Sequence, residues 1–145
     1  MSLKKSFISE KEWWRKVDFQ TLQSAQPLFS HYSSGSLMLG GVLYSHSLSI
    51  FPDEVAEELI VTEATTQFEW IKKKCFTIHK SKPEVVLVGT GTQMIFPTVA
   101  QREWLYENNL IHLEWMNTAA ACRTYNLLCG EGRRVAGLFW LDTLK

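Results

Sequence analysis

A run of four apolar residues, Val85–Val88, places the strongest constraint on how this chain can fold. The run follows Pro83 and Glu84 and leads directly into Gly89-Thr90-Gly91. A continuous β-branched run of this kind is typical of a strand that is buried in a parallel sheet. Parallel neighbours are joined by crossover connections, so the run predicts a mixed α/β fold.

The residues after this run alternate between helical and strand-like patterns. Pro97 is well placed at the start of a helix, and Val99, Trp104 and Leu105 are expected to form the apolar side of that helix. The expected order is a helix at 97–108, a strand at 111–116, a helix capped by Asn117 or Thr118 that ends near 129, and a strand at 135–141.

Shorter, β-like segments precede the run. We expect strands at 29–33, at 36–39 and 42–44 around a Gly40-Gly41 turn, at 48–51 and at 57–61, and a short helix at 66–76. Phe68, Ile71 and either Cys75 or Phe76 should lie on one side of that helix. The fold expected is therefore α/β, with an antiparallel N-terminal hairpin layer added to a central mixed, largely parallel sheet.

The domain is expected to span residues 28–145, with residues 1–27 as an arm ahead of it. In the arm, Trp13 and Val17 are one helical turn apart, and Trp14 lies beside them in the sequence. The arm either packs its tryptophans on the body or presents them to a partner, and the first interpretation is favoured. Exposed tryptophans would also suit the interface of a homo-oligomer.

Charge and composition exclude several classes of partner. Lysine plus arginine and aspartate plus glutamate each number 15 in 145 residues, so the net charge is zero. This balance predicts no nucleic-acid binding, and Lys72–Lys74 is interpreted as a solvated helix face. There is no apolar run of about 20 residues, so no membrane insertion is expected. The three cysteines form no CxxC pair, which indicates a reducing compartment and a cytoplasmic location.

No set of residues indicates catalysis, a metal or a cofactor. Cys122 lies among alanines, which favours helix packing over a nucleophilic role. The four histidines do not have the spacing of metal ligands, and a structural zinc needs four ligands. Arg133 and Arg134 follow a helix end, where cations suit the helix dipole. Asn126 is a poor residue for mid-helix, so its side chain is expected to cap the backbone of a neighbouring loop.

One group of residues is a candidate for ligand binding. Gly89-Thr90-Gly91 follows a parallel strand, and ligands of open α/β sheets bind beyond such strand ends. Asn117 and Thr118 begin a helix at the same edge, and Arg123 follows on that helix. An anion or carboxylate could be bound where these meet: Gly89, Thr90, Gly91, Asn117, Thr118 and Arg123. Alternatively, the glycines only permit a tight turn, and Arg123 pairs with Glu114 or Glu131.

Residues 84–140 resemble the Mth938-like family, a domain of unknown function that includes the mitochondrial respiratory complex I assembly factor 3. The resemblance rests on Val88-Gly89-Thr90-Gly91, Phe96-Pro97, the segment 114–126 and Glu131–Ala136. Asn117 stands where members often carry an aspartate. The resemblance implies a three-layer α/β fold and no established catalytic residues.

Two functions remain open on this basis. The leading hypothesis is a non-enzymatic binding or assembly factor with protein partners, in keeping with the resemblance and with the lack of an acid–base–nucleophile set. The alternative is a small-molecule or anion binder, or an enzyme, that uses the crevice at Gly89–Gly91, Asn117 and Arg123.

Overall fold

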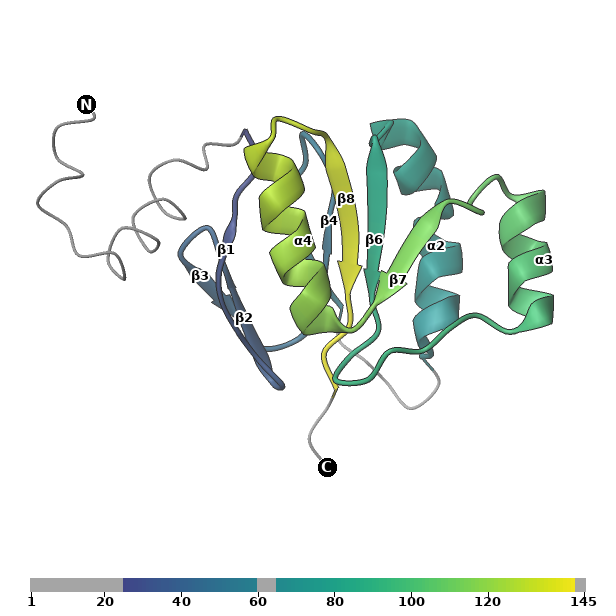
Figure 1. The fold of residues 1–145 in the computed structure, drawn as a ribbon, viewed down its shortest axis with the longest axis horizontal. Coiled ribbons are helices and arrows are strands. Elements are labelled where there is room, and N and C mark those ends of the chain that lie inside the picture. The colour runs from purple at the N-terminus through teal and green to yellow at the C-terminus, as the bar shows by residue number, and fades with distance from the viewer. Residues whose placement is uncertain (1–24, 60–64, 143–145) are drawn as a thin grey trace, which may run out of the picture.

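The computed structural model describes residues 25–59 and 65–142, which form two β-sheets and three helices (Figure 1). The smaller sheet has the order β1-β2-β3, with strands Phe29–Ser33, Ser36–Leu39 and Val42–Tyr44. The larger sheet has the order β5-β4-β8-β6-β7, with strands Glu57–Leu59, Ser47–Ile50, Val135–Phe139, Val85–Gly89 and Leu113–Met116. The helices are α2 (Gln67–Ser81), α3 (Val99–Glu107) and α4 (Thr118–Gly130).

The larger sheet is mixed. Strand β6 pairs in parallel with both β7 and β8, and α3 and α4 provide the connections between these three strands. Strand β4 pairs antiparallel with β8 and with β5. The expected α/β fold with a parallel core and an added antiparallel hairpin sheet is therefore confirmed, although antiparallel strands make up one side of the large sheet.

Side chains alternate along the central strands and so divide the interior into two cores. Leu87 of β6 packs in the core that includes α4, whereas its neighbour Val88 packs in the core that includes α2. Strand β8 alternates in the same way between Phe139 and Leu138. The result is three layers: α2 and α3, the large sheet, and a layer that contains α4 and the small sheet (Figure 1).

The small sheet is attached to α4 by aromatic packing and by one amide. The Phe29 ring of β1 contacts the rings of Tyr125 and Phe139 edge-on, with centroid distances of 5.2 and 4.8 Å. Asn126 accepts from the Phe29 N–H at 2.8 Å and donates to the Phe29 carbonyl at 2.7 Å. Asn126 thus caps the backbone of another segment, as expected, but that segment is the strand β1 and not a loop.

Two sequence expectations are corrected by the structure. Helix α2 continues to Ser81 and does not end near Phe76, whose side chain is 75% exposed. Val99 was expected on the apolar side of α3 but is 72% exposed. Helix α3 packs through its second half, where Leu105 is buried and Trp104 lies edge-on to Phe68 of α2, so its first turn projects into solvent.

The expectations for the arm at residues 1–27 lie almost entirely outside the described residues. This includes the stripe of Trp13, Trp14 and Val17. At the described end of the arm, the Gln26 side chain already bonds to the backbone of Val135 in the large sheet. The division into an arm and a domain stays a prediction.

Replacing Asn126 with alanine should destabilise the protein by about 2 kcal/mol, because two hydrogen bonds to β1 are lost at about 1 kcal/mol each. Urea unfolding followed by circular dichroism measures this change. The control is Leu127→Ala, which truncates the next residue of α4; that side chain is 55% exposed, so a change within about 0.5 kcal/mol is expected. Equal losses in the two variants would contradict the attachment through Asn126.

Candidate functional site

The candidate site begins at Gly89, where β6 ends against the first turn of α4. A Cβ atom on Gly89 would lie 3.0 Å from the Thr118 Cα atom and 3.2 Å from the Ala121 Cβ atom. Real Cβ atoms rarely approach other atoms so closely, so a side chain here would push α4 away from the sheet. Gly89 is therefore the residue that allows the helix and the strand to touch.

The two loops at this edge of the sheet are bonded to each other, as their sequence positions predicted. The Thr90 N–H donates to the Met116 carbonyl at 2.9 Å, and the Thr118 N–H donates to the Gly91 carbonyl at 2.8 Å. The Thr118 hydroxyl accepts from the Gly91 N–H at 2.8 Å and donates to the Trp140 carbonyl at 2.6 Å. Thr118 is fully buried, so its hydroxyl joins β6, α4 and the end of β8.

Asp142 also belongs to this edge, although it was not among the residues predicted from the sequence. Its carboxylate accepts from the N–H and the hydroxyl of Thr92, at 2.9 and 2.8 Å. Gly91 has a positive φ of 99°, and a Cβ there would lie 2.6 Å from an Asp142 oxygen. The sequence could have indicated this position. Asp142 follows the last strand, and the carboxyl ends of the parallel strands β6 and β8 meet at one edge of the sheet.

Asn117 is the N-cap of α4, one of the two caps that the sequence predicted. Its side-chain oxygen accepts from the Ala120 N–H at 2.8 Å. The Thr118 N–H is also taken, by the Gly91 carbonyl, and Asp142 brings a negative charge to the adjacent loop. Several of the donors that an anion would need are thus bonded within the chain.

The Arg123 side chain forms no hydrogen bond with the other candidate residues. Its side chain is exposed, and within residues 25–59 and 65–142 it forms no ion pair with Glu114, Glu131 or any other carboxylate. The structure therefore brings Gly89–Gly91, Asn117 and Thr118 together and leaves Arg123 open to solvent. A shared anion site for all six stays a prediction.

A loop with exposed apolar side chains continues directly from this edge. Met94, Ile95 and Phe96 are 51%, 52% and 65% exposed, and Val99 at the start of α3 is 72% exposed. We call these four residues the apolar loop. The buried Thr90 hydroxyl accepts from the Ile95 N–H at 3.1 Å and donates to the Gln93 carbonyl at 2.6 Å, so the loop's backbone is tied to the sheet.

The backbone at the C-terminal end of the apolar loop is also fixed by hydrogen bonds. The Thr98 hydroxyl accepts from the Gln101 N–H at 3.1 Å, and the Gln101 side chain accepts from the Thr98 N–H at 2.9 Å. This reciprocal pair is a capping box, which defines where α3 begins and how the chain enters it. The apolar side chains are therefore presented to solvent on a loop that is anchored at both ends.

The Cys122 thiol and the Tyr125 hydroxyl are buried, and their surroundings favour a role in packing. Burial raises the pKa of the Cys122 thiol to about 12, and Arg123 offsets this only in part, so the thiol stays protonated near neutral pH. Burial likewise raises the pKa of Tyr125, whose hydroxyl donates to the Pro27 carbonyl at 2.9 Å. Among the residues that the structure describes, no three His, Cys, Asp or Glu side chains cluster as metal ligands would.

The basic run on α2 is engaged in part with neighbouring side chains. Lys72 pairs with Glu69 at 3.5 Å and lies over the rings of Phe68 and Trp104. Lys74 pairs with Glu57 of β5. The Lys72 and Lys74 side chains are only 37% and 19% exposed, so the run is not a wholly solvated helix face. The expected lack of nucleic-acid binding stays a prediction.

The three-layer arrangement defines an α/β protein, and its fold matches that of Mth938-like domains. A Bordetella pertussis protein whose solution structure is described as a Mth938-like domain superposes with a TM-score of 0.62, at 24% identity, over 85% of this chain and 88% of that one. The model of a family of unknown function, DUF498/DUF598, matches residues 29–140. The chain belongs to this family, and the resemblance noted in its sequence is confirmed.

Two relatives carry names of different kinds. The "NADH dehydrogenase [ubiquinone] 1 alpha subcomplex assembly factor 3" of Bos taurus is 26% identical over 135 residues, which cover 86% of this chain and 68% of that protein. The "13 kDa major membrane protein" of Francisella tularensis subsp. holarctica (strain LVS) is 28% identical over 113 residues, or 77% of this chain and 89% of that protein. In the part of this chain that the structure describes, no helix is long and apolar enough to cross a bilayer.

Replacing Thr118 with valine should destabilise the protein by about 3 kcal/mol, because the buried Gly91 N–H and Trp140 carbonyl lose their shared partner. Thr118→Ser keeps the hydroxyl and loses one methyl group, so about 1 kcal/mol is expected. Chemical denaturation of both variants provides the comparison. If serine proves as damaging as valine, the hydroxyl is not what joins the three segments.

The free energy of unfolding should fall as the pH rises from about 9 towards 12. The Cys122 thiol of the folded protein has a pKa of about 12, whereas an ordinary thiol has a pKa of 9.0, so the unfolded chain loses its proton first and gains stability. Denaturant titrations at about pH 8 and pH 11 measure the decrease. It should be smaller in Cys122→Ala, and an unchanged decrease in that variant would contradict the assignment.

Proposed function

We propose that this protein is a non-enzymatic protein-binding factor, and that it docks on its partner through the apolar loop. The observation that carries the proposal is the exposure of Met94, Ile95, Phe96 and Val99 on a backbone anchored by Thr90 and by the α3 capping box. Adjacent exposed apolar side chains on a folded protein mark sites of interaction.

The anchoring of the loop supports a binding role on energetic grounds. Ordering a loop and its side chains on association costs free energy, which lowers affinity. Here the backbone is bonded at Gln93 and Ile95 on one side and at Thr98 on the other, so the loop is ordered before a partner arrives. A preorganised apolar loop of this kind suits recognition of a complementary apolar groove on another protein.

The name of the bovine relative supports a finer proposal, namely that the partner is a subunit or an intermediate of a multisubunit complex under assembly. Factors of this kind bind surfaces that become buried in the finished complex, and such surfaces are rich in apolar side chains. The apolar loop would cover one of these surfaces until the next subunit binds.

We also propose a cytoplasmic location. No disulfide involves Cys75, Cys122 or Cys129, which is the usual state of cysteines in a reducing compartment. The Francisella relative is named as a membrane protein. A cytoplasmic binding factor for a membrane-bound complex agrees with both observations.

The alternative function, a small-molecule or anion site at Gly89–Gly91, Asn117 and Arg123, has weaker support. The Gly91 N–H donates to the Thr118 hydroxyl and the Thr118 N–H donates to the Gly91 carbonyl, whereas the exposed Arg123 side chain forms no hydrogen bond with either residue. The expectations that the protein is not an enzyme and needs no cofactor, and the option of a homo-oligomer, stay predictions from the sequence.

An affinity capture from the natural host tests the proposal. The tagged full-length chain is compared with Ile95→Ser/Phe96→Ser, which removes two side chains of the apolar loop without touching the bonds that hold its backbone. The partner recovered with the wild type should be reduced at least about tenfold, since losing two apolar contacts costs more than 1.4 kcal/mol. Quantitative mass spectrometry gives the ratio.

Two controls make the result specific. Phe76→Ser removes an apolar side chain that is 75% exposed on α2, away from the loop, and should leave the capture unchanged. Asn117→Ala/Arg123→Ala tests the alternative site. Loss of the partner in this last variant but not in Ile95→Ser/Phe96→Ser would overturn docking through the apolar loop.

A further inference from the structure

A hollow of about 330 Å³ lies at the opposite edge of the large sheet, where the parallel strands begin. It is enclosed by the first described residues, by the loop between β4 and β5, and by the end of α4. Its lining consists of Ala25, Gln26, Pro27, the segment 51–55, Cys129 and the segment 132–134. Nothing in the proposed function uses this hollow.

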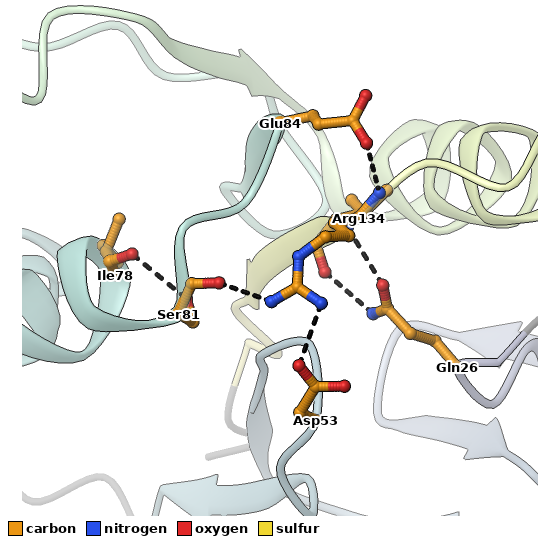
Figure 2. Close-up of polar contacts among 7 residues, drawn as sticks. Gln26, Asp53, Ile78, Ser81, Glu84 and Arg134 are labelled. Atoms are coloured by element: carbon orange, nitrogen blue, oxygen red, sulfur yellow. Dashed lines mark hydrogen bonds and ion pairs between the residues drawn. The ribbon is translucent and has the colours of Figure 1, made fainter.

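The hollow exists because β4 is shorter than its partner β8. Ile50 pairs with Gly137, and continuing this antiparallel register would set Pro52 opposite Val135. Proline has no N–H to donate, so the strand ends and the chain turns away. The Gln26 side chain takes its place, since it accepts from the Val135 N–H at 3.0 Å and donates to the Val135 carbonyl at 2.8 Å (Figure 2).

One wall of the hollow carries two arginines, and each forms an ion pair with a carboxylate of this chain. The Arg134 guanidinium donates to the Asp53 carboxylate at 2.9 Å and to the Ser81 carbonyl at 2.7 Å (Figure 2). Arg133 pairs with Glu84 at 3.4 Å. Glu54 forms no ion pair with any residue in the described ranges, and the neighbouring Val55 is 90% exposed. The rim therefore offers an uncompensated carboxylate beside an uncovered apolar side chain.

We propose that the hollow is the docking site for this chain's own segment Lys11–Lys16, whose Trp13 and Trp14 cover it. The 24 residues that precede Ala25 join the body at the wall of the hollow itself. Eleven residue steps separate Trp14 from Ala25. They span up to about 36 Å when extended and about 16 Å as a helix, so the segment can reach back in either conformation.

The chemistry of the segment complements that of the hollow. Lys11–Lys16 holds three basic residues and one acidic residue, a net charge of +2 that is complementary to the Glu54 carboxylate. An indole ring packs well on proline and phenylalanine surfaces, which Pro27, Pro52 and Phe51 supply, and its face attracts a guanidinium such as that of Arg133. The volume lies at the small end of ligand pockets and suits one aromatic side chain, with the second tryptophan over Val55.

Methyl NMR of the full-length chain tests the docking, with Val55 as the reporter. A tryptophan ring over Val55 shifts the valine methyl resonances by its ring current, and Trp13→Leu/Trp14→Leu should return them to the position of an exposed valine. Phe7→Leu is the matched control, because it changes an aromatic residue of the same N-terminal arm, outside Lys11–Lys16, and should leave the Val55 resonances unchanged. Val88, which is buried in the core between the large sheet and α2, should keep its resonances in every variant and so shows that each variant is folded.

Dilution distinguishes docking of the chain's own arm in the hollow from docking of the arm of a second copy. Docking within one chain predicts Val55 shifts that do not change over a fiftyfold dilution. Shifts that collapse on dilution would overturn the proposal and assign the hollow to the arm of a second copy. Identical Val55 resonances in the wild type and in Trp13→Leu/Trp14→Leu would overturn it outright.

Discussion

Both sheets depend on the contacts that helix α4 makes. On one side its Ala121 lies against Gly89, at a distance that only a glycine in β6 permits. On the other side Tyr125 and Asn126 hold β1 through an edge-on ring contact and two hydrogen bonds. A small residue where α4 meets β6, and a tyrosine that contacts both Phe29 of β1 and Phe139 of β8, let the helix pack on the two sheets at once. The layer order of the molecule follows from this distribution of side-chain size.

The close approach of α4 also decides what the carboxyl edge of the sheet can do. Because Thr118 is drawn under the end of β6, its hydroxyl bonds to Gly91 and Trp140, and little donor capacity is left for a ligand. The same compact edge gives Thr90 a buried position from which it anchors Ile95. An edge that binds phosphates or cofactors in other α/β proteins serves here as the support of an exposed apolar loop.

Several features could be predicted because their causes are local. The buried run Val85–Val88 needs no knowledge of its neighbours to be a central strand, and Asn117 caps the helix that follows it within the same short segment. Asn126 was expected to bond to the backbone of another segment, because the asparagine side chain disfavours the middle of a helix unless it bonds elsewhere. That its partner is Phe29, far away in the sequence, could not be read from the pattern.

Other features could not be predicted, because periodicity says which residues share a face and not whether a second element covers that face. Val99 continues the apolar pattern of α3, yet it is exposed because α2 meets only the later turns of that helix. Gln26 has no distinguishing neighbours in the sequence. Its role arises because Pro52 leaves the β4 side of Val135 without a strand partner.

The sequence by itself determined the class of fold, the order of the helices and strands and the capping of α4, since burial patterns and caps act over a few residues. Only the tertiary structure decided that Asp142 joins the edge formed by Gly89–Gly91, that Arg123 points to solvent, and that Met94–Phe96 stay uncovered. These outcomes depend on how far one packed element extends over another, and that distance is set by contacts between residues far apart in the chain.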